Sequence, residues 1–474
     1  MKVKRLKINN FRGIDDLTLE FQETYPTVII GVNGVGKSSI LDCLAILLSL
    51  MTGWLQDYTG SVRGFSEQDI TNDQNETDNE ITIVYDSQDV TWKRRHQKGS
   101  QQVPIPYNTL EQLLLIVVPG LKERISSFQL QKQIRPTLES IASSGGLYRV
   151  DLEDLRSQWE AMTGNNEFQN FVDTIRRNLL DEPSEFNLPL IVYYPINRQV
   201  SDIPLEVTEN HEFKQIDAYD QALQARQVDF KTFFEWFRKR EDLENECRLQ
   251  DAPDFIDSQL EAVRRAVSSL LDNFSNLRVR RSPLRMTIQK HNEELIINQL
   301  SDGEKCLLAM VGDLARRLAI ANPGLDNPLQ GSGVVLIDEI ELHLHPKWQR
   351  DSIPALTRTF PNCQFIVTTH SPQVISQVKP EGIYILEKTE DGIAVKQPES
   401  SYGRDSNRIL EDLMDTPERP QPIKETLLEL FRLIDEGKLS EARQLKNNLA
   451  QEIGSDEPEF ASADMLIRRK EILG

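Results

Sequence analysis

One eight-residue stretch constrains this chain more than any other feature. Residues 31–38 read GVNGVGKS, with the β-branched run TVII before them and the apolar segment 39–51 after them. In a strand–loop–helix of this kind, backbone N–H groups turn inward around phosphate oxygens, and the start of the helix favours an anion. The pattern predicts a phosphate-binding loop (residues 31–38, the phosphate loop) in preference to a chance glycine turn before a core helix.

The side chains and N–H groups of this loop have distinct expected tasks. Lys37 would place a positive charge beside the β- and γ-phosphates, and we also count it among the catalytic candidates. Ser38 would offer its hydroxyl to Mg²⁺. The nucleotide-binding candidates in and just after the loop are Asn33, Gly34, Val35, Gly36, Lys37, Ser38 and Ser39. The expected cofactors are ATP and Mg²⁺, with GTP as the alternative nucleotide.

A second motif supplies carboxylates. Residues 334–339 read VVLIDE, in which four apolar residues predict a buried strand and the acid pair, Asp338 and Glu339, follows it. Open α/β sheets bind their ligands at the carboxyl ends of the strands. We expect Asp338 to hold Mg²⁺ and Glu339 to orient and polarise the attacking water. An apolar strand ending in Asp-Glu more often leads into a surface turn, but its pairing with the phosphate loop favours a catalytic site.

A third motif, LSDGEK at residues 300–305 (the signature turn), stands ahead of a predicted helix. A serine and a glycine at a helix start form an anion site from hydroxyl, N–H groups and helix dipole. The alternative is an ordinary N-cap, in which Ser301 and Glu304 form a capping box. The nucleotide-binding candidates are Ser301, Asp302, Gly303 and Glu304.

A fourth motif is TTHS at residues 368–371, again after a strand-like run. His370 is a catalytic candidate that would donate a hydrogen bond to the γ-phosphate or contact the attacking water. A single histidine after a strand is usually structural. Its position behind three other motifs in this order favours the functional interpretation.

Composition limits the function classes. The 474 residues carry 54 Lys and Arg against 74 Asp and Glu, a net charge of −20, so the protein is not coated with basic residues. Nucleic-acid contact is therefore expected only at two basic islands, residues 92–96 (WKRRH) and 277–285 (LRVRRSPLR). Arg278 and Arg280 would share one face of a strand, for which a solvated edge strand is the alternative.

Two further observations bear on location. The apolar runs are shorter than the roughly 20 residues that span a bilayer, so no membrane contact is expected. The four cysteines are scattered without a CxxC pair, which favours neither a disulfide framework nor a zinc site. We expect a reducing, cytoplasmic environment in a prokaryote.

Taken together, GVNGVGKS, LSDGEK, VVLIDE and TTHS resemble the ATP-binding-cassette (ABC) ATPases of the RecF and SMC type. The segment NNFRG at residues 9–13 looks like the opening strand and turn of that group, in which the arginine, here Arg12, reaches toward bound nucleotide. The resemblance covers residues 1–95 and 188–390. It implies a homodimer that encloses two ATP molecules, assembled further into a higher oligomer, with Ser301 and Gly303 of one copy completing the phosphate site of the other.

Two positions depart from the pattern of that group or match it loosely. Asp302 stands where the commonest signature has glycine, although Asp is usual in the soluble branch. Gln68, within SEQDI at residues 66–70, is the candidate for the metal-binding glutamine loop.

The resemblance and the composition together predict an α/β fold: an ABC-type P-loop ATPase head with a helical insertion lobe and a C-terminal helical arm. The expected parts are residues 1–99 and 188–400 for the ATPase head, 100–187 for the insertion, and 401–474 for the arm. Long helices are expected over residues 217–248 and 255–274.

The segments between and after the motifs distinguish among the ATPases of this group. No sustained heptads separate the phosphate loop from the signature turn, so a long SMC-type coiled coil is not expected. ELHLHPKWQ at residues 341–349 looks like a stretch of the overcoming-lysogenisation-defect-like defence ATPases. His343 and His345 are expected to shape this turn at a dimer seam, with metal binding as the alternative. Too few residues follow 400 for a Toprim nuclease, and no HNH-like Cys/His set is present, so the chain itself is not expected to be a nuclease.

The tail YGRDSNRIL at residues 402–410 and FEWF at 234–237 resemble the ATPase subunit of Septu anti-phage systems (PtuA type) and the matching retron ATPases. This implies a partner HNH nuclease (PtuB-like) and, in a retron, a reverse transcriptase with its non-coding DNA. The arm would hold that partner or support assembly; a helical cap on the head is the alternative. Two other functions stay open: a RecF-like DNA-repair ATPase, and a nucleotide-gated binding scaffold with little turnover.

Overall fold

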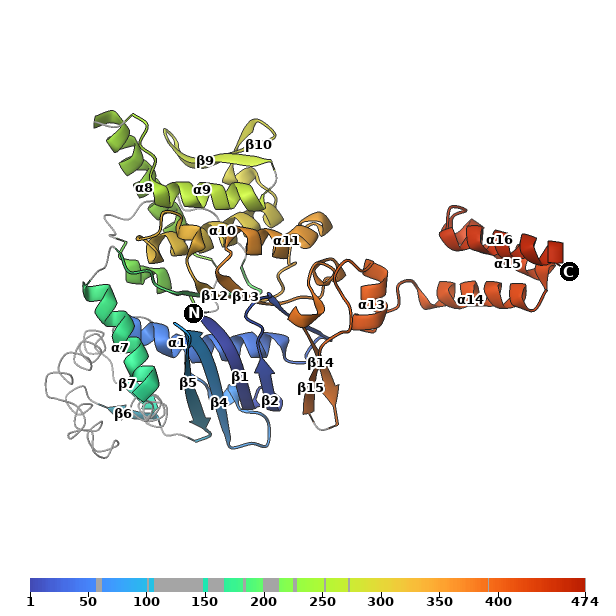
Figure 1. Ribbon diagram of the computed structural model, residues 1–474, viewed down its shortest axis with the longest axis horizontal. Coiled ribbons are helices and arrows are strands. Elements are labelled where there is room, and N and C mark those ends of the chain that lie inside the picture. Colours follow the sequence, from blue (N-terminus) through green and yellow to red (C-terminus); the bar gives the residue numbers. More distant parts are fainter. Residues whose placement is uncertain are drawn as a thin grey trace. The chain divides into compact units, whose positions relative to one another are not determined.

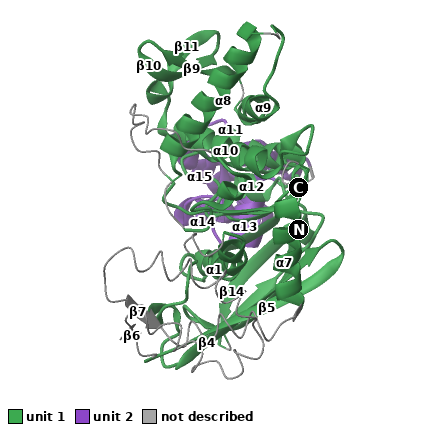
Figure 2. Ribbon diagram, turned by 90° about the vertical axis from the view of Figure 1, so that its left-hand side faces the viewer, with its two compact units in different colours: residues 1–404 green, residues 405–474 purple. Residues whose placement is uncertain are grey.

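The computed structural model forms two compact units, residues 1–404 and 405–474, which Figure 2 shows in different colours. The structure describes residues 1–56, 62–99, 102–105, 148–151, 166–181, 185–198, 213–224, 228–250, 253–271, 273–390 and 392–473.

The first unit is built on a six-stranded sheet in the order β15-β14-β3-β13-β12-β8. Its strands are β14 (Ile383–Thr389), β3 (Thr27–Gly31), β13 (Cys363–Thr368), β12 (Gly333–Ile337), β8 (Leu190–Tyr194) and the antiparallel edge strand β15 (Gly392–Lys396). Every residue of β8, β12 and β13 is buried, as in parallel strands covered on both faces. Because β3, β13 and β12 are parallel neighbours, the loops that carry three of the predicted motifs leave the sheet at one edge.

A second, antiparallel sheet has the order β2-β1-β4-β5. Its strands are β1 (Lys2–Phe11), β2 (Ile14–Glu20), β4 (Glu76–Tyr85) and β5 (Gln88–Gln97). The buried side chain of Gln364 on β13 connects the two sheets. Its amide oxygen accepts the N–H of Val3 at 2.6 Å, and its amide nitrogen donates to the carbonyl of Val3 at 2.9 Å.

Helix α1 (Lys37–Leu55) lies between these sheets and contacts strands of both (Figure 1). Contact on several sides explains why the helix is apolar around most of its circumference. Among the described residues it is the one helix long and apolar enough to cross a membrane by length and composition, but 78% of its apolar window is buried inside the protein.

A helical lobe with a small sheet completes the first unit, gathered away from the antiparallel sheet in Figures 1 and 2. Its elements are α8 (Phe230–Gln250), α9 (Ser258–Leu270), α10 (Asp302–Ala321), α11 (Pro346–Thr359) and the sheet of β9 (Phe274–Arg281), β10 (Leu284–Lys290) and β11 (Glu293–Ile296). The helix predicted from residue 217 begins only at Phe230. Before it stands a 3₁₀ turn, η3 (Gln215–Tyr219), in which Asp217 accepts the N–H of Lys214. Such local side-chain bonds favour turns over helix.

The segment 100–187 is only partly described. It contains helix α7 (Asn166–Asp181), as predicted, and an antiparallel pair that the helical prediction missed, β6 (Gln102–Ile105) with β7 (Tyr148–Asp151). Apart from residues 185–187, the rest of the predicted insertion lies outside the described residues. Phe168 of α7 packs on Trp92 of β5, with ring centroids 4.9 Å apart.

The second unit is helical, as predicted for the end of the chain. Its helices are α13 (Ser406–Met414), α14 (Gln421–Asp435), α15 (Leu439–Ile453) and α16 (Pro458–Leu473). The last three helices share a hydrophobic core formed by Leu427, Leu430, Leu433, Ile434, Ala442, Leu449, Phe460, Ala463 and Ile467.

Candidate functional site

The phosphate loop joins β3 to α1 in a conformation that glycine permits. Gly34 and Gly36 have φ of +78° and +106°. Gly36 is the N-cap of α1 and provides no side-chain cap, which leaves first-turn N–H groups for an anion. The ammonium of Lys37 donates to the carbonyls of Gly31 and Val32 at 2.9 and 3.0 Å. The loop therefore has the donors and the open helix start that fit a nucleotide phosphate.

The electrostatics of Lys37 connect the loop with the acid pair. Burial lowers the pKa of Lys37 below its usual value, although the carboxylates of Glu339, Asp338 and Glu341 act in the opposite direction. The structure therefore brings the predicted lysine and both predicted carboxylates into one electrostatic environment. Of the other predicted loop residues, Asn33 and Gly34 are exposed, Ser38 and Ser39 half-buried and Val35 buried.

The acid pair follows β12 and is held by the end of β13. The carboxylate of Asp338, only 2% exposed, accepts a hydrogen bond from the hydroxyl of Thr368 at 2.5 Å. The same hydroxyl accepts the N–H of Glu339 at 2.8 Å. Thr368 thus fixes both residues of the pair, a role that its place in the TTHS motif did not reveal.

Arg198 is a second residue that sequence reasoning missed. It follows β8 and donates to the main-chain carbonyls of Asp338 and Glu339 at 2.5 Å each. The only sequence signal was an arginine shortly after a buried strand, and nothing in the sequence indicated that β8 is the neighbour of β12.

The predicted histidine is positioned by a third unanticipated residue. His370 is half-buried, and its backbone N–H donates to Oε1 of Glu341 at 2.5 Å. The hydroxyl of Thr369 donates to Oε2 of the same carboxylate at 2.7 Å. Glu341 therefore joins the loop after β12 to the loop after β13. Its signal in the sequence was a third acidic residue close behind the acid pair.

The signature turn begins α10. Ser301 is its N-cap: the hydroxyl accepts the N–H of Glu304 at 3.4 Å, and Glu304 accepts the N–H of Ser301 at 2.9 Å. This is the capping box considered above. Lys290 pairs with Glu304 at 2.6 Å. Ser301 and Asp302 are nevertheless exposed, and among the described residues no hydrogen bond or ion pair joins Ser301–Glu304 to the phosphate loop.

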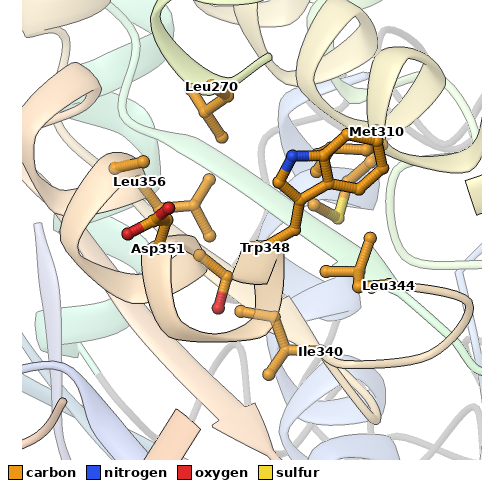
Figure 3. Close-up of a pocket in the computed structure, with 10 residues that line it drawn as sticks. Leu270, Met310, Ile340, Leu344, Trp348, Asp351 and Leu356 are labelled. Atoms are coloured by element: carbon orange, nitrogen blue, oxygen red, sulfur yellow. The ribbon is translucent and has the colours of Figure 1, made fainter. Parts of the chain in front are cut away.

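The loop after the acid pair packs between α10 and α11. Figure 3 shows Ile340 and Leu344 of this loop facing Met310 of α10 and Trp348 of α11, around a pocket of about 10 Å³, room for roughly one water. His345 is the N-cap of α11 and accepts the N–H of Lys347 at 3.3 Å, while His343 has φ of +63°. No group of three possible metal ligands occurs among the described residues, and both histidines have turn-forming roles.

The remaining nucleotide and metal candidates, Arg12 and Gln68, are connected through Asp69. Arg12 donates to the carboxylates of Asp42 on α1 at 2.5 Å and of Asp69 at 2.6 Å. Gln68 is exposed in the short turn η1 (Glu67–Asp69). The two candidates are therefore adjacent, with Asp69 between them, and their roles toward nucleotide and metal stay predictions.

Arginines of both basic islands bind other groups of the protein, which their sequence did not indicate. Arg94 is 1% exposed and donates to the carbonyls of Ile46 and Arg63, so it belongs to the core. In the second island, Arg280 pairs with Glu294, and Arg281 pairs with Glu241 and Asp242. The alternating burial around Arg278 and Arg280 agrees with one shared strand face.

Comparisons with known proteins match the chain to two domain families and to several relatives. The chain matches the AAA domain family over residues 5–275 and the AAA ATPase domain family over residues 206–375. It is 28% identical to the retron Ec83 probable ATPase of Escherichia coli, over 99% of this chain and 87% of the relative. Identity to the retron Vc95 probable ATPase of Vibrio cholerae serotype O1 biovar El Tor is 26%, over 91% and 82%.

A match over part of the chain is to the Septu protein PtuA of Bacillus thuringiensis, 32% identical over 35% of this chain and 44% of the relative. Among solved structures, the crystal structure of the SmcHead bound to the C-winged helix domain of ScpA matches with 15% identity and a TM-score of 0.43. That match covers 84% of this chain and 98% of the other.

Proposed function

This chain belongs to the AAA domain family, and from that premise we propose that it is the regulatory ATPase of an anti-phage defence complex, in which it controls a partner nuclease. The chain is an ATPase. The relatives named as retron ATPases and as Septu PtuA support the defence context.

One observation carries the proposed site: Lys37, the acid pair and His370 follow β3, β12 and β13, which are neighbours in the parallel sheet. In our proposal Lys37 and the loop N–H groups bind the phosphates of ATP, while Ser38 and Asp338 hold Mg²⁺. Glu339 orients and polarises the attacking water, and His370 hydrogen-bonds the γ-phosphate. Bound ATP supplies the phosphoanhydride bond that is cleaved.

We propose that the active form is a homodimer. Ser301 and Asp302 are exposed, and in the described part of the chain neither bonds to the phosphate loop of its own copy. We therefore assign them to contacts with nucleotide held by a second copy. Higher assembly and the nuclease partner, an HNH enzyme of the PtuB type, would use the helices of the second unit. We place this complex in the prokaryotic cytoplasm, with DNA or RNA as a further contact.

Hydrolysis by purified variants tests the site. Lys37→Ala should abolish ATP binding and hydrolysis. Glu339→Gln should bind ATP, accumulate the dimer in gel filtration and lose about 10²–10³-fold in kcat, the scale for removal of one transition-state contact. Hydrolysis by Glu339→Gln at the wild-type rate would show that another group positions the water.

Phage protection and a pull-down test the biological role. A tagged chain expressed from its own operon should recover a small HNH nuclease whose cleavage responds to ATP and, in a retron, a reverse transcriptase with its non-coding DNA. Recovery of repair factors and DNA without a nuclease would favour the RecF-like alternative. Protection that survives Glu339→Gln but not Lys37→Ala would favour a nucleotide-gated scaffold.

A further inference from the structure

Arg198 is a buried cation set against the main chain of the acid pair. The residue is 2% exposed, and the three acceptors of its guanidinium are all carbonyl oxygens: Asp338 and Glu339 at 2.5 Å and Pro195 at 3.2 Å. Within the described residues no carboxylate pairs with it. Burial of a charge without a counter-ion is unfavourable, and several strong hydrogen bonds are needed to offset it.

Two of the three carbonyls that Arg198 binds belong to consecutive residues, Asp338 and Glu339, which is unusual for extended backbone. Along a strand, successive carbonyls point to opposite sides. Here Glu339 has φ of +46°, a left-handed conformation that residues other than glycine rarely adopt. Both oxygens then reach one planar guanidinium, whose N–H groups have a fixed fork geometry. The fork therefore matches, and stabilises, the unusual conformation at Glu339.

The opposite side of Glu339 is fixed by Thr368, whose hydroxyl accepts the Glu339 N–H at 2.8 Å. The main chain of Glu339 is thus held at its N–H by Thr368 and at its carbonyl by Arg198, and the same carbonyl also accepts the N–H of Leu342 at 2.9 Å. By contrast, the Glu339 carboxylate has no hydrogen-bond partner within the described part of the chain. A fixed backbone beneath a free carboxylate is the arrangement expected for a preorganised base.

We infer that Arg198 is a positioning residue for hydrolysis: by holding the carbonyls of Asp338 and Glu339 it aims the Glu339 carboxylate at the attacking water. This inference rests on the proposed role of Glu339. The main chain of Arg198 also meets α10, because its carbonyl accepts a hydrogen bond from Cys306 Sγ at 3.8 Å. Arg198 is therefore anchored independently of the acid pair.

Two conservative variants test the inference. Arg198→Lys keeps the charge but replaces the fork with a single ammonium, and Arg198→Gln keeps one N–H₂ group without the charge. Both should lower kcat about 10- to 100-fold, the scale for a misplaced catalytic group. The Kd for a fluorescent ATP analogue should stay at the wild-type value, because the phosphate loop is untouched.

A double-mutant cycle separates positioning from general stability. In a Glu339→Gln background, Arg198→Lys should cause no further loss of kcat, because it acts through the residue already disabled. The matched control is Arg94→Lys, another buried arginine that donates to main-chain carbonyls but lies away from the acid pair. It should lower Tm and leave kcat unchanged.

Three results would overturn the inference: a full additional loss in the Glu339→Gln background, weakened nucleotide binding by Arg198→Lys, or loss of folding in both Arg198 variants. Any of these would assign Arg198 a structural role. Failure of the proposed function is distinguishable, since it would appear as undiminished hydrolysis by Glu339→Gln alone.

Discussion

Gly303 and His343 meet through the main chain: a Cβ atom on Gly303 would stand 2.2 Å from the carbonyl oxygen of His343. Gly303 lies in the first turn of α10, and His343 lies in the loop that follows the acid pair. No side chain larger than hydrogen fits between them. The signature turn and the loop after the acid pair are therefore in direct contact within one chain.

Gly303→Ala should impair hydrolysis through this contact. Helix propensity favours alanine over glycine by about 1 kcal/mol, but the 2.2 Å approach forces the loop after the acid pair to move. We expect kcat to fall at least about tenfold, the scale for displaced catalytic groups, with no gain in Tm. Wild-type kcat together with a raised Tm would contradict the prediction, because it would show that the loop after the acid pair can move without impairing hydrolysis.

Glu341→Ala should loosen the loop that carries His370. The substitution removes the acceptors of the Thr369 O–H and of the His370 N–H, so both donors lose their partners. The Thr369 oxygen keeps the N–H of Ser371, which it accepts at 3.0 Å. An unpaired buried group costs about 1–3 kcal/mol. Hydrogen exchange at residues 369–371 should accelerate and kcat should fall. Glu341→Gln keeps one carbonyl acceptor and should have a smaller effect; equal exchange in all three proteins would contradict the prediction.

Asp313 should make the stability of the first unit sensitive to acid. Burial would raise the pKa of this carboxyl, but Arg317 and Arg316 outweigh it and lower the pKa to about 2 from 3.8. The stabilisation is therefore complete above pH 3.8 and is lost as the pH falls toward 2. Urea unfolding between pH 5 and pH 2, taken as a rough window, should show the decline.

Asp313→Asn provides the matching variant. In the wild type, Arg316 and Arg317 each pair with the Asp313 carboxylate at 2.7 Å. The substitution leaves these two buried arginines without a carboxylate partner. We expect a loss of about 3–5 kcal/mol in the free energy of unfolding, together with a flatter acid dependence. A variant as stable as the wild type, with the same slope against pH, would contradict the assignment.

Two leucines on α14 form a matched pair for the second unit. Leu430 is fully buried in its core, whereas Leu428 is 62% exposed. Leu430→Ala should destabilise this unit by about 2–5 kcal/mol, and Leu428→Ala should change stability by less than about 0.5 kcal/mol. Hydrogen exchange in α14–α16 measures the difference. Equal effects of the two substitutions would show that the unit does not depend on this core.

The sheet and the phosphate loop could be predicted because their signals are local. The buried strands β3, β12 and β13 contain the short apolar runs VII, VVLI and FIV, and the GVNGVGKS loop combines glycines with a lysine in a fixed order. Motif order also predicted that the acid pair and His370 lie near the loop. These features depend on a few neighbouring residues, so one sequence contains them.

Arg198, Glu341 and Thr368 could not be predicted in the same way. Each contacts residues that are distant in sequence, because β8, β12 and β13 are neighbours only in the folded sheet. The burial of Arg94 has the same origin: its charge indicated surface, but β5 places its side chain over main-chain carbonyls of α1 and its following segment.

The position of α1 between two sheets has a mechanical consequence. A close-packed helix cannot slide without opening voids on the surfaces it leaves, and α1 is covered by strands of both sheets and by α7. Lys37 and Ser38, at its first turn, are therefore a stationary reference for the nucleotide. If a catalytic cycle displaces any part of the site, we expect the loops facing that turn to move and the first turn of α1 to stay in place.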